Sequence, residues 1–171
     1  MCGFVGFVGG TDNQSEVLTK MMDRIVHRRP DMGGQFIDGR VALGFRRLSI
    51  LDLTEAGAQP MANEDGSVVI VFNGEIYNFQ ELRSELEAKG YKFHCGADTE
   101  SLLHGYEEWG EAVLDRLRGM YAFVIWDKKN NKLFGARDIF GIKPLYYYPM
   151  ADAGDGAPGV LFGSEIKSFL D

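Results

Sequence analysis

The fold of this chain is constrained most by a series of short apolar runs that end in glycine or other turn-forming residues. Runs of this length that are rich in Val, Ile, Phe and Tyr are typical of β-strands. Strands are expected at residues 2–8, 41–51, 68–78, 91–95, 121–127, 132–138, 143–149 and 160–165. The run "VVIV" that opens residues 68–78 has no polar alternation, which predicts a strand buried on both faces.

Several segments between these runs have the spacing or the end signals of helices. They are residues 15–26, 78–90, 98–110 and 111–120. Asn78 is expected to be an N-cap, with Glu81 three residues later and Gly90 at the C-terminal stop. Asp98 is expected to cap the helix that it begins. Residues 27–35 and 52–67 are rich in turn-forming residues and are predicted to be turns or loops.

The order of these elements predicts one domain. The expected strands outnumber the expected helices, and no repeat or internal linker interrupts residues 1–171. Helices that fall between groups of strands indicate sheets packed together and covered on the outside, so an α+β fold is expected.

Composition argues against several classes of protein. The 171 residues include 18 Lys and Arg against 25 Asp and Glu, a net charge of −7. Nucleic acid is therefore not an expected partner, because such proteins usually carry a basic face. No apolar stretch approaches the length of about 20 residues that a membrane span needs. Cys2 and Cys95 make no disulfide framework, so a cytoplasmic location is expected. The histidines lack the spacing of metal ligands, and no metal site is expected.

Cys2, directly behind Met1, is the first candidate for chemistry. Removal of Met1 would leave Cys2 with a free α-amino group, whose pKa of about 7.7–8.0 suits a base near neutral pH. An N-terminal amine of this kind can activate a neighbouring nucleophile. The alternative is an ordinary buried cysteine at the start of a strand, which is common for free cysteines.

Three further positions each have a functional and a structural interpretation. Asn73 and Gly74 at the end of an apolar strand could supply an amide and a backbone N–H to an oxyanion hole, or could form a tight turn. Arg47 could bind a substrate carboxylate with its guanidinium, or be a surface arginine at a strand end. Asp98 could bind a substrate ammonium group, or cap a helix.

Taken in order, the motifs identify a family. The chain resembles the N-terminal glutaminase domain of the asparagine synthetases, which are class II (N-terminal nucleophile) glutamine amidotransferases. The matching stretches are "MCGFVG", "HRRPD", "RRLSILDL", "QPM", "FNGEIYN", "DTE", "LRGMYAFVIWD", "RDIFGIKPLYY" and "GSEIKSF". They extend from residue 2 to about residue 169, which favours the functional interpretation of Cys2.

The resemblance implies a set of site residues. Cys2 would attack the side-chain amide of glutamine with its own α-amine as the proton shuttle, and Asn73 with the Gly74 N–H would form the oxyanion hole. Arg47 would bind the α-carboxylate of glutamine. Asp98 and the Gly74–Glu75 region would bind its α-ammonium. The nearby wall of the pocket would be formed by Leu48, Ser49, Ile50 and Leu51.

The resemblance also implies an architecture and partners. The fold would be a four-layer αββα sandwich of two antiparallel sheets, the N-terminal nucleophile hydrolase fold. Ammonia would pass to an ATP-dependent synthetase domain outside this chain. No Ser-Gly-Gly-x-Asp-Ser loop occurs in residues 1–171, so ATP and magnesium are expected only in that other domain, and no cofactor in this one. A homodimer is compatible with this organisation.

Two alternatives and one departure remain at this point. The domain could serve another class II amidotransferase with a different ammonia acceptor, or be a catalytically silent interaction module. Cys2, Arg47 and Asn73 favour an enzyme, because a silent module need not keep them. Arg29 stands where the family pattern His-Arg-Gly-Pro-Asp has glycine. If that glycine has a positive φ, the loop that carries Arg29 must take another course.

Overall fold

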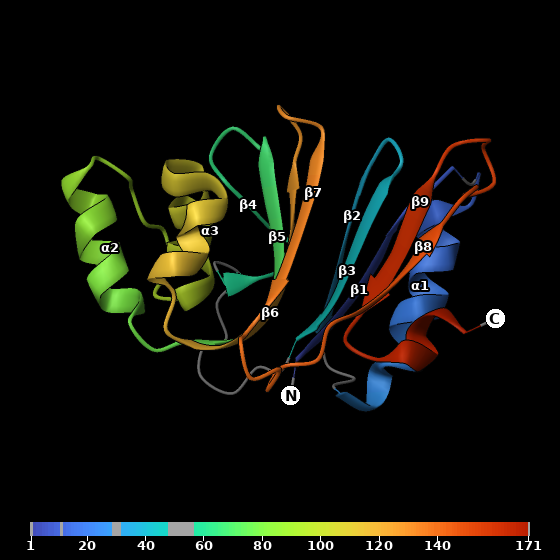
Figure 1. The fold of residues 1–171 in the computed structure, drawn as a ribbon, viewed down its shortest axis with the longest axis horizontal. Helices are drawn as coiled ribbons and strands as arrows, with labels where there is room; N and C mark the ends of the chain where they lie inside the picture. Colours follow the sequence, from blue (N-terminus) through green and yellow to red (C-terminus); the bar gives the residue numbers. More distant parts are fainter. Residues whose placement is uncertain (1, 11, 29–31, 48–56, 171) are drawn as a thin grey trace. The chain divides into compact units, whose positions relative to one another are not determined.

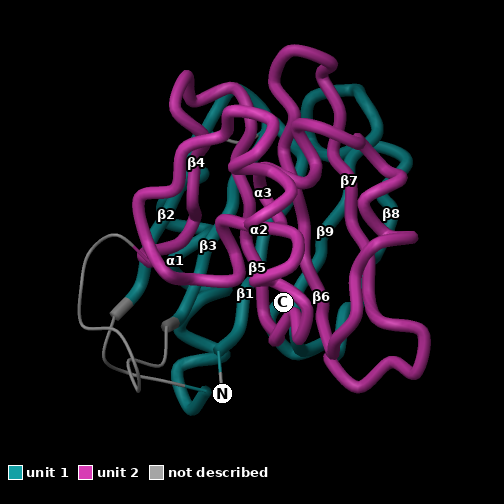
Figure 2. The backbone as a smooth tube through the Cα atoms, turned by 90° about the vertical axis from the view of Figure 1, so that its left-hand side faces the viewer, with its two compact units in different colours: residues 1–51, 144–171 teal, residues 52–143 magenta. Residues whose placement is uncertain are grey.

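A computed structural model describes residues 2–10, 12–28, 32–47 and 57–170 of the chain, except the side chains of Met32 and Arg47. The chain is divided into two units, coloured separately in Figure 2. Unit 1 consists of residues 1–51 and 144–171, and unit 2 of residues 52–143. Each unit contains its own antiparallel sheet and its own helices.

Unit 1 is built on a five-stranded sheet in the order β2-β3-β1-β9-β8, with antiparallel neighbours throughout. Its strands are β1 (Gly3–Val8), β2 (Met32–Asp38), β3 (Val41–Arg47), β8 (Tyr146–Met150) and β9 (Gly159–Gly163). Its helices are α1 (Gln14–Arg24) and the 3₁₀ helices η1 (Val26–Arg28) and η4 (Ile166–Phe169). Helix α1 lies along one face of this sheet (Figure 1) and buries Leu18, Met21 and Met22 against it.

Unit 2 is built on a four-stranded sheet in the order β4-β5-β6-β7. Its strands are β4 (Met61–Ala62), β5 (Val68–Ile76), β6 (Gly119–Asp127) and β7 (Lys132–Arg137). Its helices are α2 (Phe79–Ala88), α3 (Asp98–Trp109) and the 3₁₀ helix η3 (Gly110–Arg116). Helix α3 lies between the sheet and α2 (Figure 1). Ile70, Phe72 and Ile76 of β5 pack with Leu102 and Leu103 of α3 in one buried cluster.

Most predicted strands and helices are confirmed, but residues 91–95 do not form the predicted strand. The backbone N–H groups of His94 and Cys95 donate to the Glu100 carboxylate at 2.7 and 2.9 Å instead of to a neighbouring strand. The alternation of apolar residues in this segment reflects packing beside α3, since the ring of Phe93 lies 4.9 Å from that of His104.

The turn predicted for residues 27–35 is wrong from Met32 onward, because β2 begins there. Gly33 in this segment lies close to helix α1. A Cβ on Gly33 would lie 2.9 Å from Cε of Met22 on α1, so the bare backbone lets the helix approach the strand. The segment 111–120 is helical only to Arg116, as the 3₁₀ helix η3, and β6 begins at Gly119.

The predicted helix caps are partly wrong. Asn78 is the N-cap residue of α2, but its side chain makes no capping bond. Its amide instead donates to the Arg116 carbonyl at 2.9 Å and accepts from the Arg118 N–H at 2.9 Å. Ala97, not Asp98, is the N-cap residue of α3. Gly90 has a φ of +100°, as expected of a helix stop.

His104 is a buried cation within unit 2. Its side chain is 2% exposed, and its Nδ1 and Nε2 lie 2.7 Å from Glu107 Oε2 and 3.1 Å from the Lys92 carbonyl oxygen. Both partners are acceptors, so both ring nitrogens must carry protons. Burial alone would lower the pKa of His104. The hydrogen bond and charge of Glu107, with Glu64 and Glu100 nearby, outweigh burial and raise that pKa above its usual value.

This environment predicts a pH-dependent contribution to stability. The pKa of His104 is raised in the folded state, so the protonated ring stabilises the folded protein. This contribution is complete below the pKa of histidine in the unfolded chain, about 6.5. It is lost as the pH rises through the folded pKa. We expect His104→Gln to lower the free energy of unfolding by about 1–3 kcal/mol at pH 6, the cost of leaving a buried partner unsatisfied.

Urea denaturation of both proteins from pH 6 to 9 measures this effect. Other titrating groups are shared, so the difference between the two proteins isolates His104. The difference should shrink as the pH rises. A difference that is constant or grows with pH would show that His104 is neutral in the folded protein.

Candidate functional site

Cys2 lies immediately before β1, the central strand of the sheet in unit 1. It is half-buried, and its carbonyl oxygen accepts a hydrogen bond from Arg28 Nη1 at 3.1 Å. The start of β1 is also tied to the end of β9. The Phe4 N–H donates to Ser164 Oγ at 3.0 Å, and the Ser164 N–H donates to the Phe4 carbonyl at 2.9 Å. Cys2 is therefore held at an anchored strand end.

Arg47 lies at the same end of this sheet as Cys2. In the pairing of β1 with β3, Gly3 is opposite Arg46, and Arg47 is the next and last residue of β3. The register therefore places the Arg47 backbone next to the position that Cys2 occupies. Leu48, Ser49, Ile50 and Leu51, predicted to form the pocket wall, lie outside the described residues, as does Arg29.

In unit 2, the Asn73 side chain is buried without a partner for its amide nitrogen. It is 2% exposed, and Nδ2 is the one buried side-chain nitrogen or oxygen without a hydrogen bond among the described residues. An unsatisfied buried donor costs about 1–3 kcal/mol, so such groups are rare unless they serve a function. Asn73 and Gly74 both lie within β5, which excludes the tight turn considered from the sequence.

The Gly74 N–H lies on a strand edge between two side-chain acceptors. On this edge of β5, the Phe72 N–H donates to Gln59 Oε1 at 2.6 Å and the Ile76 N–H donates to Asp98 Oδ2 at 2.8 Å. Backbone N–H groups alternate between the two edges of a strand, so that of Gly74 points the same way as these two. A Cβ on Gly74 would lie 2.2 Å from the Met120 carbonyl oxygen, which explains why this position is glycine.

Asp98 connects the first turn of α3 to this edge of β5. Its pKa is raised, chiefly because burial disfavours the charged carboxylate; the Ile76 and Thr99 N–H groups oppose this shift, and the charge of Glu75 adds to it. A buried carboxylate of this kind gains from a cationic partner. The predicted ammonium-binding residues Asp98 and Glu75 are thus both in unit 2, where the Glu75 side chain is exposed.

Gln59 is a residue that the sequence analysis did not assign. It lies within the predicted loop of residues 52–67 and acts on β5 through its side chain, which also donates from Nε2 to Thr99 Oγ1 at 3.3 Å. Its position in the motif "QPM" is the only signal in the sequence. Thirteen residues separate Gln59 from Phe72, so no local pattern relates them.

A group of potential metal ligands in unit 2 does not fit a metal site. Glu64, His104 and Glu107 place one ligand atom each within 4.8 Å of one another. Both nitrogens of His104 donate hydrogen bonds, so the ring offers no lone pair to an ion.

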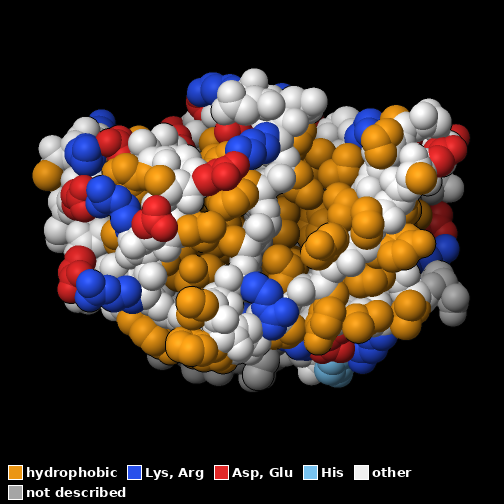
Figure 3. All heavy atoms as spheres, in the orientation of Figure 1, with side chains coloured by type: hydrophobic (Ala, Val, Ile, Leu, Met, Phe, Trp, Pro, Cys, Tyr) orange, Lys and Arg blue, Asp and Glu red, His pale blue; other side chains and the backbone are white. Residues whose placement is uncertain are grey.

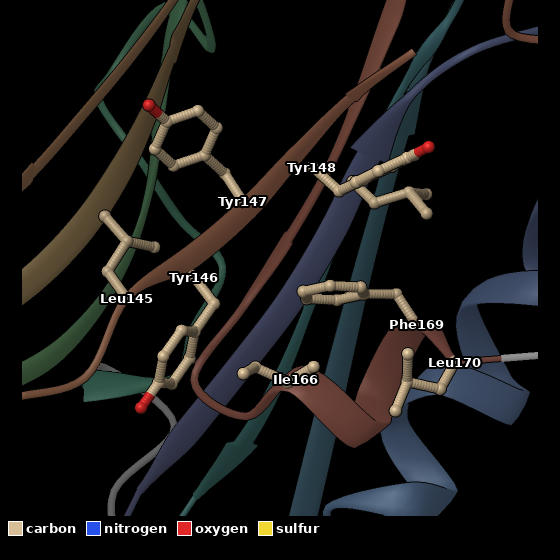
Figure 4. Close-up of a pocket in the computed structure, with 8 residues that line it drawn as sticks. Leu145, Tyr146, Tyr147, Tyr148, Ile166, Phe169 and Leu170 are labelled. Atoms are coloured by element: carbon tan, nitrogen blue, oxygen red, sulfur yellow. The ribbon is translucent and has the colours of Figure 1, made fainter.

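Unit 1 also has an apolar groove of about 510 Å³ (Figure 4), beside the hydrophobic side chains that gather over β8 and β9 in Figure 3. It is lined by Leu145, Tyr146, Tyr147, Tyr148, Leu161, Ile166, Phe169 and Leu170. Its described lining contains no Cys, His, Asp or Glu, and tyrosine hydroxyls are its only polar side-chain groups, so amide hydrolysis is not expected there. No helix in the described part of the chain is long and apolar enough to cross a membrane.

The family of the chain follows from sequence comparison. A model of the glutamine amidotransferase domain matches residues 1–171. The chain belongs to this family. This membership supports the roles that are proposed below for Cys2, Asn73 and Gly74.

Relatives in this family are asparagine synthetases. "Asparagine synthetase [glutamine-hydrolyzing] 1" of Bacillus subtilis is 51% identical over 99% of this chain and 27% of its own length. "Asparagine synthetase [glutamine-hydrolyzing]" of Asparagus officinalis is 40% identical over all of this chain and 28% of its own length. The chain thus spans about a quarter of the length of these relatives.

Solved structures show the fold. Glutamine phosphoribosylpyrophosphate amidotransferase from B. subtilis, complexed with ADP and GMP, aligns with a TM-score of 0.78 at 23% identity. The alignment covers 98% of this chain and 43% of that one. The fold class predicted from the sequence, α+β with two antiparallel sheets and helices, is confirmed.

The unpaired amide of Asn73 predicts an unusual response to mutation. Asn63 is a matched control in the same unit, because its Nδ2 donates to Glu107 Oε1 at 2.6 Å and its Oδ1 accepts from the Val68 N–H at 3.0 Å. We expect Asn63→Ala to cost about 1–3 kcal/mol by leaving buried partners unsatisfied. Asn73→Ala breaks no hydrogen bond from Nδ2. It should therefore lower the free energy of unfolding by about 1 kcal/mol less than Asn63→Ala does.

Chemical denaturation of the two variants and the parent protein measures both costs. Equal losses of stability would mean that the Asn73 amide is paired in the folded protein.

Proposed function

We propose that this chain hydrolyses the side-chain amide of glutamine, with Cys2 as an N-terminal nucleophile after removal of Met1. The observation that carries the proposal is the buried, unpaired Nδ2 of Asn73 beside the Gly74 N–H on β5. Two donors at one point are what a tetrahedral oxyanion requires. Membership of the glutamine amidotransferase family supports the same reaction.

The reaction proceeds in two stages. The α-amine of Cys2 takes the thiol proton, and Sγ attacks the amide carbon of glutamine to form a tetrahedral oxyanion that Asn73 and Gly74 stabilise. Collapse of this intermediate breaks the carbon–nitrogen bond, and the α-ammonium returns its proton to the departing ammonia. Water, deprotonated by the same amine, then hydrolyses the thioester to glutamate and regenerates the thiol.

The proposal assigns a residue to each α-group of glutamine. Arg47 binds the α-carboxylate as a guanidinium fork, and Leu48, Ser49, Ile50 and Leu51 form the wall beside it. Asp98 and the Gly74–Glu75 region bind the α-ammonium. The partly buried carboxylate of Asp98 supports this role, because a cationic ligand would offset the cost of its charge.

We propose asparagine synthesis as the fate of the ammonia. Relatives at 40% identity and above carry asparagine synthetase names, whereas the phosphoribosylpyrophosphate amidotransferase is 23% identical. A synthetase domain outside residues 1–171 would activate aspartate with ATP and magnesium in the cytoplasm. Isolated residues 1–171 should then release glutamate and ammonia from glutamine but form no asparagine. Asparagine formation by these residues alone would contradict this division of labour.

Two substitutions separate the proposed catalytic and binding roles. Asn73→Ala should lower kcat by about 10²–10³, the usual effect of removing one oxyanion donor. Its effect on KM should be small, because the negative charge develops only in the transition state. Arg47→Ala should mainly raise KM, because the guanidinium of Arg47 binds the α-carboxylate of glutamine in this proposal, and that group does not react.

Steady-state assays of glutamate release measure both effects. A change in KM alone for Asn73→Ala would remove it from the oxyanion hole. An unchanged KM for Arg47→Ala would place the carboxylate-binding group elsewhere.

A further inference from the structure

An ion pair lies directly behind Cys2 in unit 1. Arg28, the last residue of η1, donates from Nη1 to the Cys2 carbonyl oxygen at 3.1 Å. Its Nε donates to Oε1 of Glu165, which lies in the turn between β9 and η4. The guanidinium therefore joins the first residue of the processed chain to a carboxylate 163 positions later.

Each partner of this pair is fixed by its surroundings. The side chains of Arg28 and Glu165 are only 12% and 22% exposed. A Cβ on Gly3 would lie 2.7 Å from Cδ of Arg28, so the glycine gives the arginine stem its place over β1. Ser164, which precedes Glu165, exchanges two hydrogen bonds with Phe4 of β1. The carboxylate is thus attached to the strand that begins at Cys2.

Glu165 is charged in this setting. Burial alone would raise its pKa, but hydrogen bonds from Arg28 and His27 outweigh burial and lower it. His27 Nε2 lies 2.9 Å from Oε1, and Lys167 Nζ lies 3.4 Å from Oε2. A charged carboxylate that binds Arg28 and lies beside Lys167 holds the guanidinium in one orientation more firmly than solvent would.

We propose that Glu165 is a positioning residue for Cys2 and acts through Arg28. The proposal rests on the function of Cys2 proposed above. A residue at a chain end is held by one peptide bond, so its thiol and amine can turn freely. A hydrogen bond to its carbonyl fixes the plane of that peptide group, and with it the geometry of the amine, Sγ and the attacked carbon.

The test uses Glu165→Gln, which keeps the shape of the side chain and removes its charge. We expect kcat per titrated Cys2 to fall by about 10- to 100-fold, because a misplacement of about 1 Å can cost about 100-fold. KM for glutamine should change by less than about threefold, since this pair does not contact glutamine's α-groups in the proposed mode of binding. Because Arg28 transmits the effect, Glu165→Gln combined with Arg28→Gln should be no slower than Arg28→Gln alone.

A second readout does not require turnover of glutamine. Iodoacetamide alkylation of Cys2, followed by mass spectrometry of the N-terminal peptide, should slow by a similar factor in Glu165→Gln. Cys95 in the same samples is the internal reference and should react at the parent rate.

Asp155→Asn is the matched control. Arg40 and Asp155 form another partly buried ion pair of unit 1, with Nε 2.6 Å from Oδ2, beyond the opposite end of β1. This substitution removes a carboxylate of the same kind and should change neither kcat nor the alkylation of Cys2. If Glu165→Gln does not fold, Glu165→Asp takes its place, with the same readouts and a smaller expected loss.

The outcomes separate this proposal from the function on which it rests. Parent values of kcat and Cys2 alkylation in Glu165→Gln, with only a lower free energy of unfolding, would overturn the positioning role. Additive losses in the double variant would also overturn it. Absence of glutamine hydrolysis in the parent protein would instead refute the proposed function, and the alkylation rates would still decide whether Glu165 positions the thiol.

Discussion

The pairing of β5 with β6 is the interaction on which the site in unit 2 depends. It runs from Val68 opposite Asp127 to Ile76 opposite Gly119, and it satisfies one edge of β5. The other edge is short of strand partners, because β4 covers only Val69 and Ile70. Side chains from distant parts of the unit bind this edge instead, since Gln59 accepts from the Phe72 N–H and Asp98 accepts from the Ile76 N–H. Asn73, whose buried amide nitrogen is unpaired, lies between these two positions on β5.

Unit 1 has a different task in the proposed mechanism, which is to hold the strand end at Cys2. β1 is the central strand, and it pairs with β3 from Gly3 onward and with β9 from Val5 onward. The described strand pairing does not reach Cys2, and hydrogen bonds with Arg28 and Ser164 hold the strand end instead. Half-burial leaves Cys2 accessible, as a nucleophile requires. The proposed oxyanion donors lie on an inner strand, and the proposed nucleophile lies next to one. Inner strands are rigid, so they hold such groups in place more precisely than loops would.

Local patterns predicted the elements of this fold better than the contacts between them. The strands were recognisable because runs of β-branched and aromatic residues fit a half-buried pleated surface. The caps were mispredicted because Asn78 and Asp98 bind backbone groups of other elements, which no local pattern contains. Cys2 and Asn73 became candidate site residues through the order of the motifs, and their roles stay predictions. Gln59 and Glu165 were missed because their partners are 13 and 137 residues away in the sequence.

In the proposed mechanism, the free α-amine of Cys2 activates the thiol of the same residue. The most direct measurement compares two preparations of known intact mass, one that begins at Cys2 and one in which an uncleaved residue precedes it. We expect glutamine hydrolysis by the first form only, because an amine within a peptide bond cannot accept the thiol proton. Equal activity of the form that retains the preceding residue would contradict it.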